Sequence, residues 1–136
     1  MHLKESNTNI NTNDVSDIVK LYFEDGVIVG EFAKDLHVTD KVAKRIVKAR
    51  KEMSNYEPCL ILVDVTSVKS VTKSGRDYFG SPEGSDLLIA SAIYSNNRLS
   101  NFLANFLIKV NLIKSRIKVK LFDDRAKAMK WLSSFK

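Results

Sequence analysis

The chain has 136 residues, 44% of them hydrophobic and 28% charged, which is the size and composition of one globular domain and excludes an intrinsically disordered chain. No apolar run approaches the ~18 residues that span a bilayer, and residues 1–10 lack the apolar region of a secretory signal, so we expect a cytoplasmic protein. Lysine and arginine number 22 against 16 acidic residues, and the net charge of +6 makes nucleic acid a partner class to consider.

The chain opens with a polar segment and a hairpin. Residues 1–14 are rich in Asn, Ser and Thr and predict a flexible N-terminal tail before one domain over residues 15–136. Two β-rich runs follow, at 18–23 and 27–32, and Asp25-Gly26 lies between them. Asp-Gly favours a tight hairpin because both positions tolerate a positive φ.

The next segment predicts an amphipathic helix that Thr39 or Asp40 caps. Its inner face is formed by Val42, Ala43, Ile46, Ala49, Arg50 and Met53, which recur at near-helical spacing. Its outer face carries five basic residues: Lys41, Lys44, Arg45, Lys48 and Lys51.

The middle of the chain predicts the centre of the sheet. Residues 59–65 form an apolar run that is short for a helix and typical of a strand covered on both faces. Cys59, the single cysteine, is interpreted as a small core residue in a reducing compartment. A short helix is predicted over 72–79, a group of helix breakers over 80–84, and another apolar strand over 87–94.

The C-terminal third predicts a helix, a strand and a final helix. From Leu99 onward, Phe102, Phe106 and Leu107 belong to a wide apolar helix face. Residues 117–122 alternate as a strand, and Asp123 or Asp124 caps the last helix. That helix is expected to bury Ala128, Trp131, Leu132 and Phe135. The predicted order is ββαβαβαβα: an N-terminal hairpin, then a mostly parallel α/β sheet with packed helices.

The chain offers little catalytic chemistry, so we expect no enzyme, no cofactor and no metal site. His37 is predicted in a loop, with no second histidine or cysteine at ligand spacing. The glycine patterns that cradle phosphates are missing from the sequence. Asp123 and Asp124 are adjacent in a strand-to-helix turn, where capping explains them better than an acid/base pair.

Two motifs, together with the element order, carry a family resemblance over residues 18–135. One is the run 62–68 followed by Val71, Thr72, Lys73, Ser74 and Gly75; the other is the closing strand, acidic turn and Ala-x-x-Trp-Leu helix that ends at Leu132. Both resemble the STAS family, the sulphate-transporter and anti-sigma-factor-antagonist domains with a SpoIIAA-like fold, in its uncharacterised branch. The resemblance implies a SpoIIAA-like fold and a non-enzymatic regulatory or protein-interaction module.

The resemblance also implies a phosphorylated serine at the start of the helix, where this chain has Lys73. Thr72 or Ser74 could still accept phosphate there, but helix capping is the simpler role. The leading hypothesis is an interaction surface for a protein partner. It is formed by Thr72, Lys73, Ser74, Arg76, Asn96, Asn97 and Arg98.

Two other functions stay open. An apolar pocket for a small molecule or lipid, or a homodimer face, is predicted at Phe102, Phe106 and Leu107. Nucleic-acid binding would use the basic helix face and the cations Lys114, Arg116, Lys118 and Lys120. We disfavour nucleic acid, because strand cations commonly protect a sheet edge and no aromatic residues are interleaved for base stacking.

Overall fold

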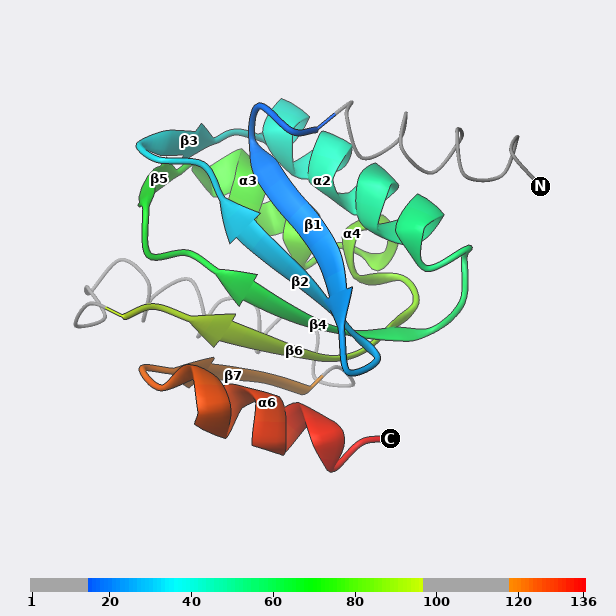
Figure 1. Ribbon diagram of the computed structural model, residues 1–136. Helices are drawn as coiled ribbons and strands as arrows, with labels where there is room; N and C mark the ends of the chain where they lie inside the picture. Colours follow the sequence, from blue (N-terminus) through cyan, green and yellow to red (C-terminus); the bar gives the residue numbers. More distant parts are fainter. Residues whose placement is uncertain (1–14, 97–117) are drawn as a thin grey trace.

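The structure of the protein is a computed structural model, which describes residues 15–96 and 118–136 (Figure 1). In chain order its elements are β1 (Val19–Glu24), β2 (Val27–Phe32), β3 (Leu36–Val38), α2 (Asp40–Met53), β4 (Cys59–Asp64), β5 (Val68–Val71), α3 (Lys73–Phe79), α4 (Pro82–Ser85), β6 (Leu88–Tyr94), β7 (Lys118–Phe122) and α6 (Arg125–Ser133). Five strands form one sheet in the order β1-β2-β4-β6-β7, and β3 pairs with β5 in a second, small sheet. The predicted α/β fold class, with a mostly parallel sheet and an N-terminal hairpin, is confirmed.

The opening hairpin forms as predicted. Asp25 and Gly26 have φ angles of 50° and 79°, so both central positions of the turn are left-handed, as a two-residue hairpin turn requires. The hairpin is the antiparallel part of the sheet; β2–β4, β4–β6 and β6–β7 all pair in parallel.

Each face of the five-stranded sheet is covered by different helices. Alternate residues of β2 and β4 point to opposite faces. Ile28 and Ile61 pack in a core cluster with Ile46 of α2, whereas Val29 and Leu62 pack with Leu132 of α6. In Figure 1, the ribbons of β1 and β2 pass in front of α2, α3 and α4, and α6 lies on the viewer's side. The prediction that β4 is central and covered on both faces is confirmed.

The first helix, α2, forms with four of the five predicted outer basic residues exposed, whereas Lys51 is half-buried and its side chain donates to the carbonyl of Glu83 in α4. Thr39 is its N-cap, and its hydroxyl accepts a hydrogen bond from the backbone N–H of Val42 at 3.2 Å. Arg50 is only 2% exposed, so its predicted place on the inner face is confirmed.

The last strand and helix also follow the prediction. Lys118 and Lys120 are exposed on β7, which lies at an edge of the described sheet. Asp124 caps α6 by accepting from the N–H of Lys127 at 2.9 Å. Ala128 and Leu132 are buried, whereas Trp131 and Phe135 are half-buried and stack edge to face, with ring centroids 4.9 Å apart.

Three elements were not predicted: β3, β5 and α4. The loop prediction for His37 is wrong, because this residue lies in β3 and its Nδ1 is 2.6 Å from Ser70 Oγ on β5. Residues 80–84 do end α3, but Pro82 also begins the single turn α4, with Ser81 as its N-cap. A Cβ at Gly84 would lie 1.9 Å from the carbonyl oxygen of Tyr78, so only glycine fits there.

Candidate functional site

The predicted interaction surface is centred on the first residues of α3. Thr72 is the N-cap; its hydroxyl accepts from the N–H of Gly75 at 3.0 Å and lies 3.1 Å from Ser74 Oγ. The backbone N–H of Thr72 donates to the carbonyl of Val38 at 2.9 Å, which ties the start of α3 to β3. Thr72, Lys73 and Ser74 are all exposed. The capping role considered for Thr72 is therefore confirmed, and its phosphorylation stays a prediction.

The other members of that surface are less closely grouped. Lys73 forms an exposed ion pair with Asp77, one turn along α3, at 2.9 Å. Arg76 is half-buried, and its Nε has no hydrogen-bond partner within the described part of the chain. Asn96 follows β6 and donates its backbone N–H to Thr66 Oγ1 at 3.0 Å, so it lies on a separate turn. The structure thus gathers four of the predicted residues at α3 and places Asn96 beside the β4–β5 connection.

The remaining predicted site residues fall outside the described ranges. They are Asn97 and Arg98 of the interaction surface, and Phe102, Phe106 and Leu107 of the apolar pocket or dimer face. Lys114 and Arg116 of the basic stretch lie outside them as well.

An apolar cavity of about 100 Å³ lies between the sheet and the helices α2, α3 and α4. Its walls come from elements far apart in the sequence and include Phe32, Ile46, Ile61, Val63, Val65 and Phe79. Of the described residues that line the cavity, only Arg50 and Ser91 have polar side chains. Such a concave, mostly apolar space with a few polar groups is the usual form of a small-molecule site.

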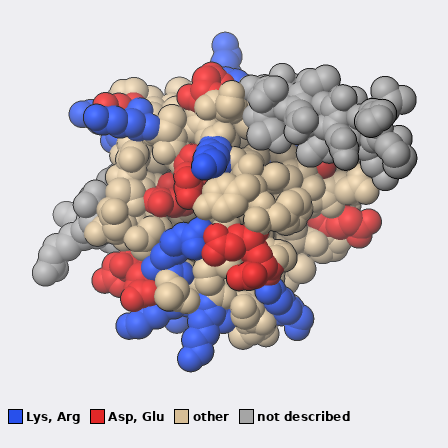
Figure 2. Space-filling view, in the orientation of Figure 1, with Lys and Arg blue, Asp and Glu red and all other residues tan. Residues whose placement is uncertain are grey.

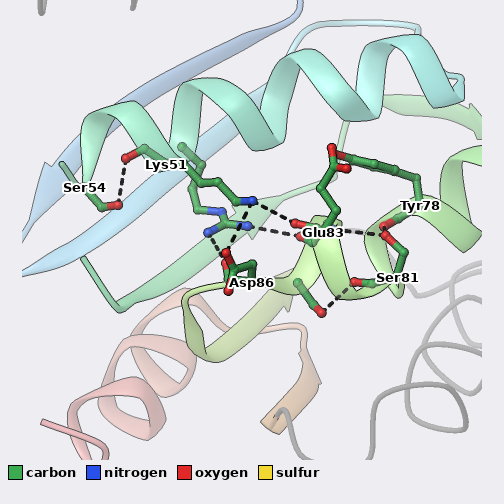
Figure 3. Close-up of polar contacts among 9 residues, drawn as sticks. Lys51, Ser54, Tyr78, Ser81, Glu83 and Asp86 are labelled. Carbon is green, nitrogen blue, oxygen red and sulfur yellow. Dashed lines mark hydrogen bonds and ion pairs between the residues drawn. The ribbon is translucent and has the colours of Figure 1, made fainter. Parts of the chain in front are cut away.

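The side chain of Arg50, on α2, is hydrogen-bonded to the chain that follows α3. Its Nη1 donates to the carbonyl of Asp86 at 2.8 Å and its Nη2 to the carbonyl of Gly84 at 3.1 Å. The neighbouring Lys51 donates to the carbonyl of Glu83 at 2.9 Å (Figure 3). The carbonyls at the C-terminal end of α4 therefore receive cationic donors from α2, which suits the negative end of a helix. We call Arg50, Lys51 and the carbonyls of 83, 84 and 86 the α2–α4 clasp.

Comparison with known proteins places the chain in a family. Residues 21–136 match the family described as "Domain of unknown function (DUF7793)". The chain belongs to this family. No curated protein matches it.

A solved structure gives the fold of this DUF7793 domain. The chain is similar to the crystal structure of an uncharacterized protein of the DUF3478 family, with a SpoIIAA-like fold, from Shewanella loihica PV-4. The similarity has a TM-score of 0.57 and 13% sequence identity, and it covers 84% of this chain and 91% of that one. The predicted SpoIIAA-like fold is confirmed; at this identity the likeness concerns the fold alone.

A tyrosine and a glutamate extend the clasp on its outer side. Tyr78 OH donates to Glu83 Oε2 at 2.6 Å, and Ser81 OH donates to the carbonyl of Tyr78 at 2.6 Å (Figure 3). Burial, followed by the hydrogen bond to the Glu83 carboxylate, raises the pKa of Tyr78 to about 12. The phenol of Tyr78 is therefore neutral over the physiological range and supports α4.

Cys59 lies at the start of β4, on the face that α2 covers. Its side chain is buried, and burial raises the pKa of the thiol; the nearby Arg50 guanidinium and Ser54 hydroxyl offset this only in part. A buried thiol that stays protonated is a poor nucleophile. The interpretation of Cys59 as a core residue is confirmed.

The viewer's face of the DUF7793 domain carries both signs of charge side by side (Figure 2). Arg125 of α6 forms a bidentate pair with Glu24, with N–O distances of 2.9 and 3.0 Å, and also donates to Tyr22 OH at 3.2 Å. Tyr22 in turn donates to Glu31 at 2.6 Å. The hydrogen bond from Arg125 lowers the pKa of the Glu24 carboxyl. Interspersed pairs of this kind join α6 to the hairpin and do not form a continuous basic stripe there.

Within residues 15–96 and 118–136, no three His, Cys, Asp or Glu side chains gather so that they could hold a metal ion. No helix in these ranges is long and apolar enough to cross a membrane.

The cavity is not predictable from the sequence pattern, although two of its residues, Arg50 and Ser91, are signals of it. The inward position of Arg50 was a signal, because a charged residue on an apolar helix face has to find buried partners. Ser91, in the middle of an apolar strand, was another. Neither residue belongs to a motif, and the space between them depends on how the helices pack.

Proposed function

We propose that this DUF7793 domain is a non-enzymatic binding module that takes up a small apolar ligand, or an apolar group of a larger one, in the cavity behind the sheet. The observation that carries the proposal is the cavity itself, with about 100 Å³ of space and aliphatic or aromatic side chains on nearly all of its described lining. Some of the lining residues, such as Val63 and Leu88, are half-buried, so the space is a concave apolar recess of the kind in which proteins hold small apolar groups.

The size and lining of the cavity define the class of ligand. An engineered apolar cavity of roughly 150 Å³ stays dry and binds benzene, so a cavity of about 100 Å³ suits a compact aliphatic or aromatic group. Transfer of each buried CH₂ group from water contributes about 0.8 kcal/mol, which gives such a site measurable affinity without catalytic residues.

The proposal is tested by titrating hexan-1-ol into the full chain and following the methyl groups of cavity residues by NMR. We expect shifts at Ile61, Val63 and Ile93, which line the cavity. Native mass spectrometry of protein purified without detergent should also show a bound mass. Unchanged methyl resonances at all three positions, up to the solubility limit of the alcohol, would overturn the proposal.

A pair of variants on β6 supplies the control. Ser91→Leu places a larger apolar side chain in the cavity and should abolish the response to hexan-1-ol. Ile89→Leu introduces the same side chain two residues away, where Ile89 is 40% exposed, and should leave the response unchanged.

A second candidate is a regulatory protein-interaction module that uses the start of α3. It is favoured by the exposure of Thr72, Lys73 and Ser74 on a segment held rigidly by the N-cap and by β3. A combined Lys73→Ala and Ser74→Ala variant leaves the capping Thr72 in place and should weaken association with a protein partner, or self-association, in pull-down and sedimentation measurements. Unchanged association with every partner recovered by the wild-type domain would refute this candidate.

A further inference from the structure

Arg50 is the only charged residue that is buried among those the structure describes. It is 2% exposed, and it also lines the apolar cavity. A charged side chain taken out of water is costly unless it is paired and hydrogen-bonded, so a buried arginine needs an explanation in terms of its partners. Arginine keeps its charge inside proteins, so Arg50 cannot avoid the cost of burial by losing a proton.

The partners of Arg50 in the clasp carry no formal charge. Its guanidinium donates to the backbone carbonyls of Gly84 and Asp86, and no carboxylate of the described residues lies within 4.0 Å of it. The carboxylate of Asp86 is instead 3.7 Å from Lys51 Nζ. The guanidinium has five N–H donors in a fork that matches a carboxylate; the two carbonyls accept one hydrogen bond each, and the neutral Cys59 side chain is a further neighbour.

Arg50 lines the cavity, and its guanidinium is hydrogen-bonded to a second lining residue, Gly84. Gly84 accepts the hydrogen bond from Nη2 of Arg50 and itself lines the cavity, as do the neighbouring Phe79 and Leu88. A ligand inside the cavity would therefore have its apolar part against the valine and isoleucine side chains of the sheet and one end near Arg50.

We propose that the ligand is an aliphatic monocarboxylate whose short chain fills the cavity and whose carboxylate pairs with Arg50. This inference rests on the proposed function, because it names the polar end of the ligand in the same cavity. Charge complementarity selects an anion, and the volume of about 100 Å³ limits the enclosed chain to roughly four to six carbons by comparison with cavities that hold benzene. The alternative role of Arg50 is purely structural: it would only join α2 to α4.

The test compares hexanoate with hexan-1-ol, two probes with the same chain and different ends, by calorimetric titration of the full chain at neutral pH. We expect hexanoate to bind at least ten times more tightly than the alcohol, with an affinity that falls as salt is raised. Equal or weaker binding of hexanoate would overturn the proposal of a carboxylate ligand, whereas the proposal of an apolar binding site would remain. Binding of neither probe would overturn both proposals.

Variants then assign the preference to Arg50. Arg50→Met keeps an apolar stem of similar length and should abolish the preference for hexanoate while hexan-1-ol still binds. Lys51→Met removes the adjacent cation of the clasp and should retain the preference. If Arg50→Met does not fold, Arg50→Lys keeps the charge without the bidentate fork and should reduce the preference several-fold. An unchanged preference in the folded Arg50 variant would show that Arg50 is structural only.

Discussion

The two faces of the five-stranded sheet differ in packing, although the same strands build both. Against α6, small residues such as Ala90, Ala92 and Ala128 are fully buried at 0% exposure, and the helix lies close to the strands. Against α2, α3 and α4, larger side chains leave a cavity and enclose the charged Arg50. The α6 face is therefore closely packed, whereas the opposite face has space between its side chains.

The largest expected effect comes from truncating one leucine on each face. Leu132→Ala should destabilise the domain by about 3 kcal/mol, because Leu132 of α6 is fully buried against the sheet and its truncation opens a new cavity. Leu88→Ala should lower the free energy of unfolding by about half as much, since Leu88 is half-buried and already borders the cavity. Urea denaturation of both variants measures the contrast, and equal losses would contradict the difference in packing.

The second effect comes from enlarging neighbouring residues of β6 that point to opposite faces. Ala92→Val adds methyl groups to the tight face and should cost about 2 kcal/mol through overpacking. Ser91→Val adds a similar volume to the cavity side and should change the free energy of unfolding by less than about 0.5 kcal/mol. A comparable loss in the two variants would mean that the cavity side is as tightly filled as the α6 side.

A third, smaller effect concerns the start of α3, which belongs to the cavity face. Thr72→Ala should cost about 1 kcal/mol, because the N–H of Gly75 loses its capping oxygen. Thr72→Ser keeps that oxygen and should be nearly neutral. Thermal denaturation gives both values; a Thr72→Ala variant as stable as the wild type would show that the cap contributes nothing.

The smallest effect is confined to alkaline pH. The pKa of Tyr78 is about 12 in the folded domain against an ordinary 10.0, so the neutral phenol stabilises the fold fully below pH 10.0, and this contribution is lost as the pH rises through about 12. Tyr78→Phe should remove this part of the alkaline loss of stability, and the ultraviolet absorbance titration should lose the tyrosine that ionises near pH 12, while Tyr22, whose pKa burial also raises, should still titrate late. An unchanged titration would show that a different tyrosine ionises near pH 12.

Much of the fold could be predicted from local chemistry. The Asp25-Gly26 turn, the cap at Thr39 and the cap at Asp124 each depend on one or two residues and their immediate neighbours; the turn was predicted, and each cap was predicted to within two adjacent residues. The apolar run that became β4 needed only its length and its lack of polar residues. The inner position of Arg50 followed from helical spacing.

The rest depends on contacts between distant segments. β3 and β5 have three and four residues and exist because they pair with each other, so neither is recognisable alone. The cavity depends on residues from nine elements meeting with space between them, which periodicity does not encode. The predicted pocket residues Phe102, Phe106 and Leu107 lie outside the described ranges and stay predictions.

The hairpin has a consequence for the order in which the domain assembles. Of the strand pairs described, β1–β2 alone is joined by a two-residue turn, so its contacts are local and should form within roughly ten microseconds. Each parallel pair has to wait until a long crossover connection brings its strands together. We therefore expect the sheet to grow from the β1–β2 edge towards β7, with the cavity face completed only after β6 has paired.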